Sequence, residues 1–434
     1  MIKSIIISWM VMILSLSTAY GQEVLPLHDA ISIAIQNNYN VRISQNQTVI
    51  NKANNTLGNA GFLPVLALNF GQNFNINNTR QEFFSGDVRE GSGVNTNNLN
   101  ANLLMSWTLF DGMRMFVNRD QLSEIESIGK LNMSLQIENT ITQVMSIYYS
   151  LEQQKRMIQT IKQAIDISKE RLALASLQKE VGTGSAMPIL QAEVDINADS
   201  AMLTRQELIL KNTKVELNQI LGRNPETSFE TLESEALPLL EYSDVVQKAE
   251  DRSLLLKLAD NNLKLSELNI KQWETNKYPT VDLNVGYNYT RFTAEIGVLK
   301  FNQNRGLSFG LTGRWNIFDG YNNKREIQVA KLGLETNQLI KEQTELSLKT
   351  DILTLYNSYI TALDMVDMED KNIRIAQQTL DITSDKMRIG TINSLELRQA
   401  QLNLVDTQFR KITAAFEAKM AALELMRLSG QLIN

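Results

Sequence analysis

The residue types that most often carry chemistry are scarce in this chain. Its 434 residues include one histidine, His28, and no cysteine. The sequence therefore offers no imidazole cluster for zinc, no thiolate metal site and no disulfide framework. Two triplets, Gly91-Ser92-Gly93 and Gly182-Thr183-Gly184, lack the following lysine or third glycine of a phosphate-binding loop. We therefore predict no catalytic site, no cofactor and no bound metal, and we expect His28 to lie at a helix start.

Composition and the N-terminal sequence limit the possible binding partners and the cellular compartment of the chain. The net charge of −6 and the lack of a Lys/Arg-rich block argue against a nucleic-acid partner. Lys3 precedes an apolar run, Ile5 to Leu16, and small and polar residues follow it up to Gly21. This order is typical of a secretory signal peptide over residues 1–21, because the run is shorter than the roughly twenty residues of a spanning helix. No later stretch is long and apolar enough for a membrane helix, so strands would have to carry the chain into a membrane.

The chain is duplicated. Trp107-Thr108-Leu109-Phe110-Asp111-Gly112 returns 208 positions later as Trp315-Asn316-Ile317-Phe318-Asp319-Gly320. The same offset relates four further pairs: Tyr148 and Tyr356, Gly182 and Gly390, Ala192 and Ala400, and Gly222 and Gly430. Because several kinds of feature recur in one order at one spacing, we predict two structural repeats, over 22–222 and 243–434, joined by a linker over 223–242.

Two segments in each repeat alternate strictly between apolar and polar residues. They predict strands over about 65–76 and 97–109, and over about 281–291 and 306–317. These segments are about ten to thirteen residues long, which suits a tilted bilayer crossing better than the usual five or six. Their polar positions are mostly Asn, Ser, Thr and Gly, as in a wet lumen, and aromatic residues stand near their ends. We favour transmembrane strands; the alternative is an exposed sheet packed on a soluble core.

Long helices are predicted for the rest of each repeat. They cover about 29–59, 113–178 and 188–221 in the first repeat, and about 244–276, 322–387 and 394–429 in the second. Apolar residues in the longest two recur at spacings of four and three, so these helices should pack lengthwise on partners. Tight turns at Val181–Ser185 and Ile389–Ser394 should join them into antiparallel hairpins. In each turn a glycine ends one helix, and capping residues (Gly184 and Ser185, or Asn393 or Ser394) begin the next.

Four strands cannot close a barrel. Open strand edges in lipid leave unpaired backbone groups that cost several kcal/mol each, so the chain should oligomerise. Three copies would supply twelve strands, which lies within the range of known outer-membrane barrels. The fold class expected is therefore an α+β membrane protein. In it, four strands per chain contribute to a 12-stranded outer-membrane β-barrel, and long helical hairpins form a trimeric α-barrel.

This duplicated plan resembles the TolC family of outer-membrane efflux and secretion channels. The resemblance rests on the Trp107–Gly112 motif, on Tyr148 and Tyr356, and on the two glycines that are followed ten residues later by Ala192 and Ala400. It covers roughly residues 23–430. It implies a homotrimer in the outer membrane and its lipid, in a Gram-negative bacterium, with a large periplasmic part. It also implies that a periplasmic adaptor and an inner-membrane pump dock at the helical tips.

The resemblance further implies an aperture at the periplasmic end. In the family two acidic residues line it, six and nine positions after the second-repeat glycine, and this chain has Glu396 and Gln399 there. Only the first keeps a carboxylate, so a ring of three Glu396 side chains would favour cations more weakly; the alternative is an ordinary exposed charge. The family's inter-helix latch uses a tyrosine and an arginine where this chain has Met387 and Ile392. Any latch must therefore differ, and Arg388 is a candidate contributor.

The hairpin turns resemble the family's adaptor-contact turns, over Val181, Gly182, Thr183, Ile389, Gly390 and Thr391. The glycines would also simply cap helices. We expect a channel component of a tripartite efflux or type I secretion system, not an enzyme, that passively conducts substrate from pump and adaptor to the exterior. The alternative is a non-conducting structural or adhesive coiled-coil protein of the envelope, which leaves the paired alternating segments unexplained. The sequence does not distinguish among drugs, metal ions and polypeptides as cargo.

Overall fold

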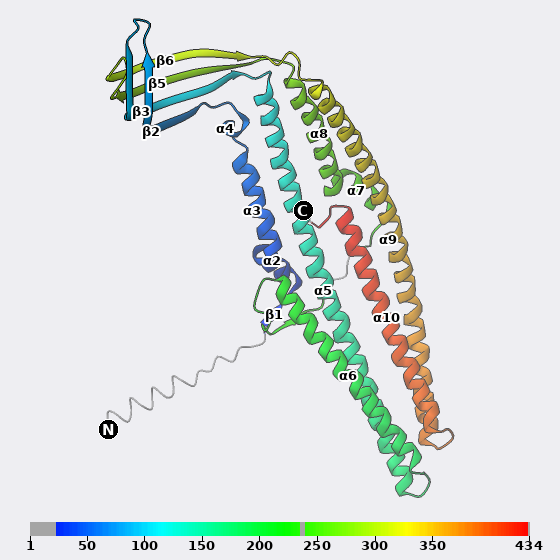
Figure 1. Ribbon diagram of the computed structural model, residues 1–434. Helices are drawn as coiled ribbons and strands as arrows, with labels where there is room; N and C mark the ends of the chain where they lie inside the picture. Colours follow the sequence, from blue (N-terminus) through cyan, green and yellow to red (C-terminus); the bar gives the residue numbers. More distant parts are fainter. Residues whose placement is uncertain (1–22, 235–238, 433–434) are drawn as a thin grey trace, which may run out of the picture. The chain divides into compact units, whose positions relative to one another are not determined.

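The protein was analysed as a computed structural model, which describes residues 23–234 and 239–432 (Figure 1). The signal peptide predicted over 1–21 lies outside these residues. The described chain forms two compact units. The helical unit comprises the residues up to Gln45, Met133–Leu255 and the residues from Glu345, and the sheet unit comprises Asn46–Asn132 and Leu256–Thr344. Each unit therefore combines segments of both sequence repeats.

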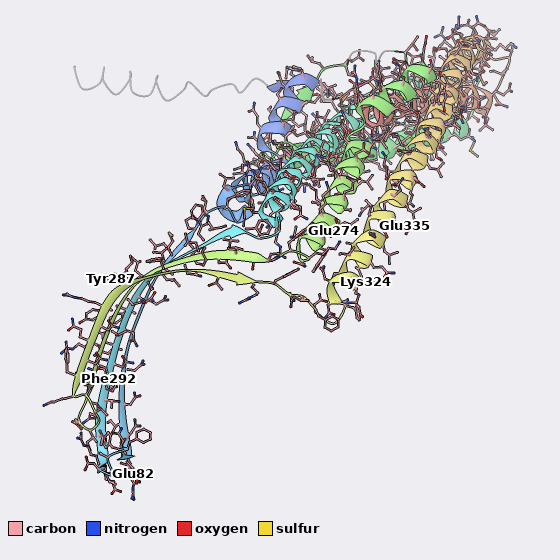
Figure 2. The ribbon with its side chains drawn as sticks, turned by 90° about the horizontal axis from the view of Figure 1, so that it is seen from above. Glu82, Glu274, Tyr287, Phe292, Lys324 and Glu335 are labelled. Atoms are coloured by element: carbon pink, nitrogen blue, oxygen red, sulfur yellow. The ribbon has the colours of Figure 1, made fainter. Side chains whose placement is uncertain are left out.

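The sheet unit contains a four-stranded antiparallel sheet in the order β2-β3-β5-β6. Its strands are β2 (Val65–Glu82), β3 (Val88–Phe110), β5 (Thr280–Ala294) and β6 (Phe301–Arg314). The first hairpin runs well past its predicted ends, because polar residues there still pair across the ladder, as Arg80 does with Glu90. The last strand stops at Arg314, short of the predicted residue 317. Figure 2 shows Glu82 at the far end of the sheet.

Alternation gives the sheet two chemically different faces. One row of the apolar face crosses all four strands through Leu68, Leu103, Tyr287 and Leu307. On the other face, the side chain of Asn102 donates to Asn288, and Asn288 Nδ2 donates to Ser308 Oγ at 3.0 Å. Figure 2 shows side chains projecting from both faces of the strands. The predicted alternation is thus present in three dimensions, with apolar side chains and an amide-rich network on opposite sides.

The duplicated motif forms the same strand-to-helix junction twice. Gly112 and Met113 have φ of 72° and 71°, and Gly320 and Tyr321 have φ of 68° and 64°. The aspartate before each glycine then caps the following long helix, since Asp111 accepts from Met115 N at 2.9 Å and Asp319 accepts from Asn323 N at 2.7 Å. The motif is therefore recurrent because it builds a tight left-handed turn followed by a helix start.

The tryptophan of each motif ties the end of a hairpin to its beginning. Trp107 Nε1 donates to Phe62 O at 2.9 Å, and Trp315 Nε1 donates to Lys277 O at 3.1 Å. Both acceptors stand two residues before the prolines, Pro64 and Pro279, that precede the first strand of each hairpin. The two hairpins are thus closed at their base in the same way.

The helices begin and end close to their predicted bounds, with two exceptions. The long helices are α5 (Arg114–Glu180), α6 (Met187–Ile220), α9 (Asn322–Arg388) and α10 (Ser394–Leu428). The shorter ones are α2 (Leu27–Asn37), α3 (Tyr39–Asn54), α4 (Leu57–Ala60), α7 (Tyr242–Arg252) and α8 (Leu254–Thr275). The single helices predicted over 29–59 and 244–276 were wrong, since each is interrupted. Among the described residues, no helix combines the length and apolar character that a membrane crossing requires.

The interruptions at Asn38 and Ser253 stand 215 residues apart and have a common cause. Asn38 Oδ1 accepts from Asn40 N at 2.9 Å and so starts α3, while Asn38 Nδ2 donates to Ile220 O at 2.9 Å. The glycine that ends α6 packs against this break: a Cβ on Gly222 would lie 2.6 Å from Asn37 O. At the second break, a Cβ on Gly430 would lie 3.0 Å from Arg252 Cβ. Each short helix therefore breaks where the end of a returning helix meets it.

The region predicted as a linker contains a strand. β4 (Phe229–Thr231) pairs in parallel with β1 (Glu23–Leu25) in the helical unit. Both strands pack with α5 and α6 in one core, which includes Leu25, Tyr148, Leu217 and Phe229. This segment is therefore part of a packed core.

In the helical unit the two hairpins pack side by side (Figure 1). Val144 of α5 and Leu217 of α6 share one core. Tyr149 of α5 and Leu423 of α10 share a second core, and Leu380 of α9 packs with α10 in a third. The contacts therefore run from α6 to α5, from α5 to α10 and from α10 to α9.

Tyr148 should stabilise the helical unit more than its repeat counterpart. Its hydroxyl lies 3.0 Å from Leu25 O and 2.9 Å from Leu232 O, and it accepts from Leu232 N. Burial raises its pKa, so the group stays a neutral donor. We expect Tyr148→Phe to lower the free energy of unfolding by about 1–3 kcal/mol, because buried backbone groups lose their partner. Tyr356→Phe is the matched control, since that ring is half-buried and stacks near Tyr242; equal losses in thermal unfolding would contradict this assignment.

Candidate functional site

The turn between α5 and α6 ends the first helical hairpin. Gly182 has φ of 81°, its N donates to Lys179 O at 3.1 Å, and Thr183 N donates to Gln178 O at 2.9 Å. The Thr183 hydroxyl also donates to Gln178 O, at 3.1 Å. These contacts satisfy the last carbonyls of α5, so the glycine and the threonine have a structural role. Val181, by contrast, is 64% exposed and has no such role.

The turn between α9 and α10 repeats this geometry. Gly390 has φ of 74°, and Thr391 donates to Lys386 O from both its N, at 2.9 Å, and its hydroxyl, at 3.0 Å. A Cβ on either turn glycine would meet nothing within 4 Å, so only the left-handed backbone favours glycine there. Ile389 is 75% exposed. Each hairpin tip therefore presents one solvent-exposed aliphatic side chain on a rigid turn.

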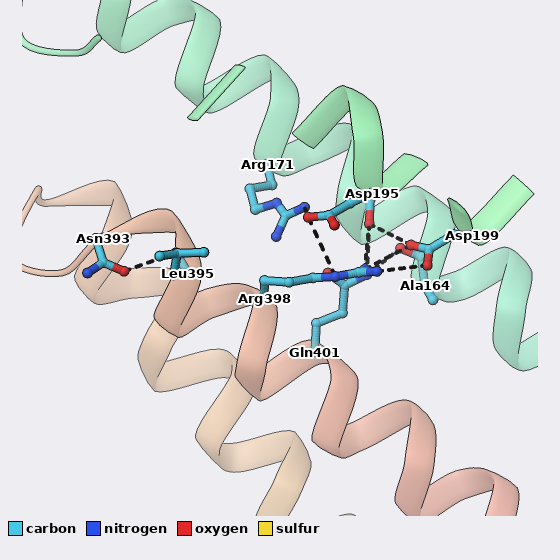
Figure 3. Close-up of polar contacts among 9 residues, drawn as sticks. Ala164, Arg171, Asp195, Asp199, Asn393, Leu395, Arg398 and Gln401 are labelled. Carbon is cyan, nitrogen blue, oxygen red and sulfur yellow. Dashed lines mark hydrogen bonds and ion pairs between the residues drawn. The ribbon is translucent and has the colours of Figure 1, made fainter. Parts of the chain in front are cut away.

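The helix starts after the two turns differ. Asn393 is the N-cap of α10, and its side chain accepts from the N of Leu395 and the N of Glu396 (Figure 3). The capping predicted for Gly184 and Ser185 is wrong: α6 starts after Ala186, which makes no side-chain cap hydrogen bond. Gly184 instead lies over the end of α5, where its N donates to Gln178 O at 2.8 Å.

The two residues predicted for the aperture lie on the exposed surface of the first turns of α10. Gln399 Nε2 donates to Asn403 Oδ1 at 2.9 Å. Within residues 23–234 and 239–432, the Glu396 carboxylate has no hydrogen-bond or ion-pair partner. One copy of the chain therefore leaves this carboxylate free to face solvent or another copy.

Among the described residues, the side chains at the family's latch positions form no ion pair between the hairpins, although Gln178 Nε2 of α5 donates to Met387 O of α9 at 3.3 Å. Met387 is buried with Leu380, Leu397 and Leu404, and Ile392 packs against the same cluster. Arg388 is exposed and pairs with Asp385 of its own helix at 3.6 Å. Apolar packing thus replaces the tyrosine and the arginine, and Arg388 does not join the two hairpins.

An ion-pair network that the sequence did not reveal joins the hairpins instead. Arg398 of α10 donates from Nη1 and Nη2 to the two carboxylate oxygens of Asp199 in α6, each at 2.9 Å. Its Nε lies 3.5 Å from Asp195 Oδ2, and Asp195 also pairs with Arg171 of α5. Figure 3 shows the two carboxylates facing the two guanidinium groups. Three helices are therefore held by four charges.

The network is largely buried. The side chains of Arg171, Asp199, Arg398 and Asp195 are 1%, 10%, 14% and 26% exposed. Burial opposes the charge of Arg398, but the hydrogen bonds and the negative charges of Asp199 and Asp195 outweigh it and raise its pKa. All of these contacts lie among residues near the tips. A clue in the sequence was the spacing of Asp195 and Asp199, since like charges four apart on a helix repel each other unless partners compensate.

Two uncharged residues extend the network. Gln401 Nε2 donates to Ala164 O at 2.7 Å and lies 2.9 Å from Ser168 Oγ, and Ser168 Oγ donates to Asp199 Oδ2 at 3.1 Å. Arg171 Nε and Gln401 Oε1 are buried without a hydrogen-bond partner among the described residues. The network is thus incomplete at two deeply buried atoms, one of them in the Arg171 guanidinium, and each unpaired atom lowers the stability of the network.

In the part of the chain that the structure describes, no group of three or more His, Cys, Asp or Glu side chains could hold a metal ion. The site therefore consists of two aliphatic tips, an exposed carboxylate and a buried ion-pair network. The exposed tips and the carboxylate can contact another protein surface. None of the groups of this site is placed as a nucleophile beside a base.

Known proteins with this plan are membrane channels. The sequence model of the outer membrane efflux protein family matches residues 30–223 and 245–431. Protein CyaE of Bordetella pertussis is 20% identical over 352 residues, which cover 79% of this chain and 74% of that protein. Outer membrane efflux protein BepC of Brucella suis is 20% identical over 329 residues, covering 75% and 70%. The fold is similar to that of the Campylobacter jejuni CmeC outer membrane channel, with a TM-score of 0.76, 12% identity and coverage of 94% and 87%.

Arg398→Met should loosen the contact between the two hairpins. It keeps the side-chain bulk but leaves Asp199 and Asp195 buried with too little positive charge, at a cost of about 3–5 kcal/mol. We expect faster amide hydrogen exchange in the tip halves of α5, α6 and α10. Arg388→Met is the matched control, because its ion pair is exposed and local. Unchanged exchange in Arg398→Met, or equal effects of the two variants, would show that the network does not hold the hairpins.

Proposed function

Since the chain belongs to the outer membrane efflux protein family, and is thus an outer-membrane channel of efflux or secretion, we propose that three copies of it close into the conducting pore. The observation that carries this proposal is the sheet with two open edges. Among the residues that the structure describes, β2 and β6 each pair with one neighbour only, and every residue of β6 is exposed. A strand edge in lipid must be paired, so a second copy must cover each edge.

The dimensions of the apolar face support a bilayer crossing. On β3 this face extends from Leu99 to Leu109. At about 3.4 Å per residue the ten steps rise about 34 Å, and a strand tilt of about 40° reduces this to about 26 Å along the membrane normal. This agrees with the roughly 25 Å apolar band of outer-membrane barrels. The opposite face would line a lumen of Asn, Ser and Thr, in which Thr108 donates to Asp282 at 2.7 Å.

The helices also leave two edges open. The helix order places α6 and α9 at the ends of the row. On α9, exposed apolar side chains recur at intervals of seven or eight residues, at Leu346, Leu353, Ile360, Met368, Ile375 and Ile382. α6 offers the exposed Met187, Val194, Leu208 and Val215 and the half-buried Ile189 and Ile196. Stripes of this period are the seams of coiled coils. In the proposed trimer, α9 of one copy packs on α6 of the next and the helices close into a tube.

The ion-pair network is proposed as the latch of this tube. It holds the two hairpins of one copy together near their tips, and so limits how far the ring can widen. Three Glu396 side chains would line the narrowest point and favour cations. The exposed Val181 and Ile389 would contact a periplasmic adaptor, which couples the channel to an inner-membrane pump. Since BepC is an efflux protein, small molecules are the cargo we propose first.

Reconstitution in planar bilayers tests the pore and the latch together. We expect the mature protein to form long-lived pores, and Arg398→Met to open more often than Arg388→Met. An inserted trimer that stays silent in both variants would contradict the conducting role. A protein that never inserts would contradict the channel and favour the envelope coiled coil.

Ion selectivity tests the aperture. Glu396→Ala should reduce the preference for cations, because it removes the carboxylate from each copy of the ring. Gln399→Ala is the neutral control one helical turn away on the same exposed surface. Equal reversal potentials for Glu396→Ala, Gln399→Ala and the unmodified protein would rule out a charged aperture at this position.

A double variant tests the docking tips. Val181→Asp with Ile389→Asp places a charge on each exposed tip but leaves the capping glycines and threonines in place. We expect loss of efflux in cells with unchanged trimer yield and unchanged single-channel conductance. Full efflux by this variant would remove the tips from the adaptor interface.

A further inference from the structure

Within one chain the two repeats pack against each other. Among the described residues, the repeat-equivalent positions at the outer edges of the chain are not in such a contact in a single copy. We infer that a second copy of the chain fills these counterparts residue by residue, in a register that the internal repeat specifies. The inference rests on the proposed oligomeric pore but goes beyond it, because it fixes which residues meet. The occupant is a second copy, since only the repeat of this chain supplies the matching residues.

The two hairpins have the same internal register. Leu68 pairs with Leu103, and the residues 215 and 208 positions later, Leu283 and Leu311, pair with each other. The offsets are therefore 215 for the first strand of a hairpin and 208 for the second. The same two offsets relate the sequences of the two hairpins and the residues that pair in them, so the repeats are geometrically equivalent in this sheet.

The pairing between the repeats can then be carried to the open edges. Within the chain, β3 pairs with β5, and Asn102 stands opposite Asn288. The counterpart of β3 is the edge strand β6, and the counterpart of β5 is the edge strand β2. Applying the two offsets places Gly310 opposite Asn73 of the partner subunit.

The side chains fit this register. On the polar face it pairs Gly310 with the partner's Asn73. On the apolar face it sets Phe309 opposite the partner's Phe74 and Leu307 opposite the partner's Ile76, which gives aromatic and aliphatic cross-strand pairs. It also sets Gly313 opposite the partner's Phe70, where an aromatic ring covers a glycine. A slip by one residue would bring apolar residues onto the polar face, and a slip by two would set Phe309 opposite the partner's Gln72 or the partner's Ile76.

The junction after β6 contains a second empty counterpart. A Cβ on Gly112 would lie 2.5 Å from Thr275 O and 2.8 Å from Tyr278 Cβ, so this glycine admits a close contact between the repeats. Gly320 has the same left-handed backbone, but among the described residues a Cβ there would meet only Asn322, at the start of the following helix. The offset of 215 leads from Tyr278 to Leu63, which is 56% exposed and which the partner subunit would place against Gly320.

The helical unit shows the same relation independently. Ile167 and Leu174 of α5 are partly buried against the core that contains Leu397 and Leu404 of α10. Their counterparts on α9, Ile375 and Ile382, are exposed. The counterparts of the two α10 leucines are Ile189 and Ile196 of α6, so an apolar pair is available at each position when α9 meets α6 of the partner subunit.

Cysteine pairs test the register, because the chain has no cysteine of its own. The matched variant is Gly310→Cys with Asn73→Cys; Gly310 has room for a side chain, since a Cβ there meets nothing within 4 Å. The shifted variant is Gly310→Cys with Asn75→Cys, which stays on the same face two residues away. The internal control is Asn102→Cys with Asn288→Cys, whose side chains touch within one chain. All three are oxidised in membranes and separated by denaturing gel without reductant.

We expect covalent dimers and trimers from the matched variant, only monomers from the shifted variant, and an internal cross-link without larger species from the control. Cross-links in the shifted variant, or none in the matched variant while the control forms its cross-link, would overturn the register. Native mass and bilayer conductance are measured on the same samples. A conducting trimer with the wrong cross-link would sink this inference alone, whereas a monomer without conductance would sink the proposed pore.

Discussion

The unpaired backbone of the two edge strands is the constraint on which the rest of this structure depends. Each edge of the sheet presents a row of N–H and C=O groups, and a bilayer supplies no partner for them. The first and last strands, β2 and β6, are long, and most residues of β2 and every residue of β6 are exposed. In the pore that we propose, further copies of the chain pair with these edges and close the sheet.

The same requirement explains why the helices end their row with apolar stripes. α6 and α9 each leave a set of apolar side chains exposed, and a monomer would lose stability by hydrating them. A shared closure of strands and helices satisfies backbone groups in one unit and apolar surface in the other. In lipid, the unpaired backbone groups of the edge strands require a partner. In water, burial of the exposed apolar side chains of α6 and α9 favours one.

Much of this fold could be predicted from the sequence, because its elements are long and regular. Strict alternation located the four strands, and the absence of proline located the long helices. The breaks at Asn38 and Ser253 were missed because neither is a proline or glycine; they arise where a returning helix ends against the short helix. The extension of the first two strands to Glu82 and from Val88 was also missed, since the polar residues there pair through the backbone without alternating.

The candidate site was less predictable, since its contacts join residues far apart in the chain. The tip turns were evident from Gly182 and Gly390, because a left-handed turn leaves a local mark. The Arg398 network left almost none: its partners lie about 200 residues away, and only the spacing of the two aspartates hinted at it. Long-range ion pairs have no local pattern. The sequence pointed instead to Arg388, which pairs with Asp385 of its own helix.

The two repeats have diverged in charge more than in shape, and this decides where a latch can be. The counterparts of Arg398, Asp199 and Asp195 at an offset of 208 are Leu190, Thr407 and Asn403. None of these can form an ion pair, whereas the apolar positions around them have apolar counterparts. The seam proposed between copies would therefore be joined by packing alone, and the charged contact belongs to the interface within a copy. Apolar surfaces can slide past one another without leaving a charge unpaired, but the buried network must either stay intact or be hydrated as a whole. A symmetric scaffold thus carries an asymmetric set of charges, and the latch that we propose around Arg398 has no charged counterpart at the seam between copies.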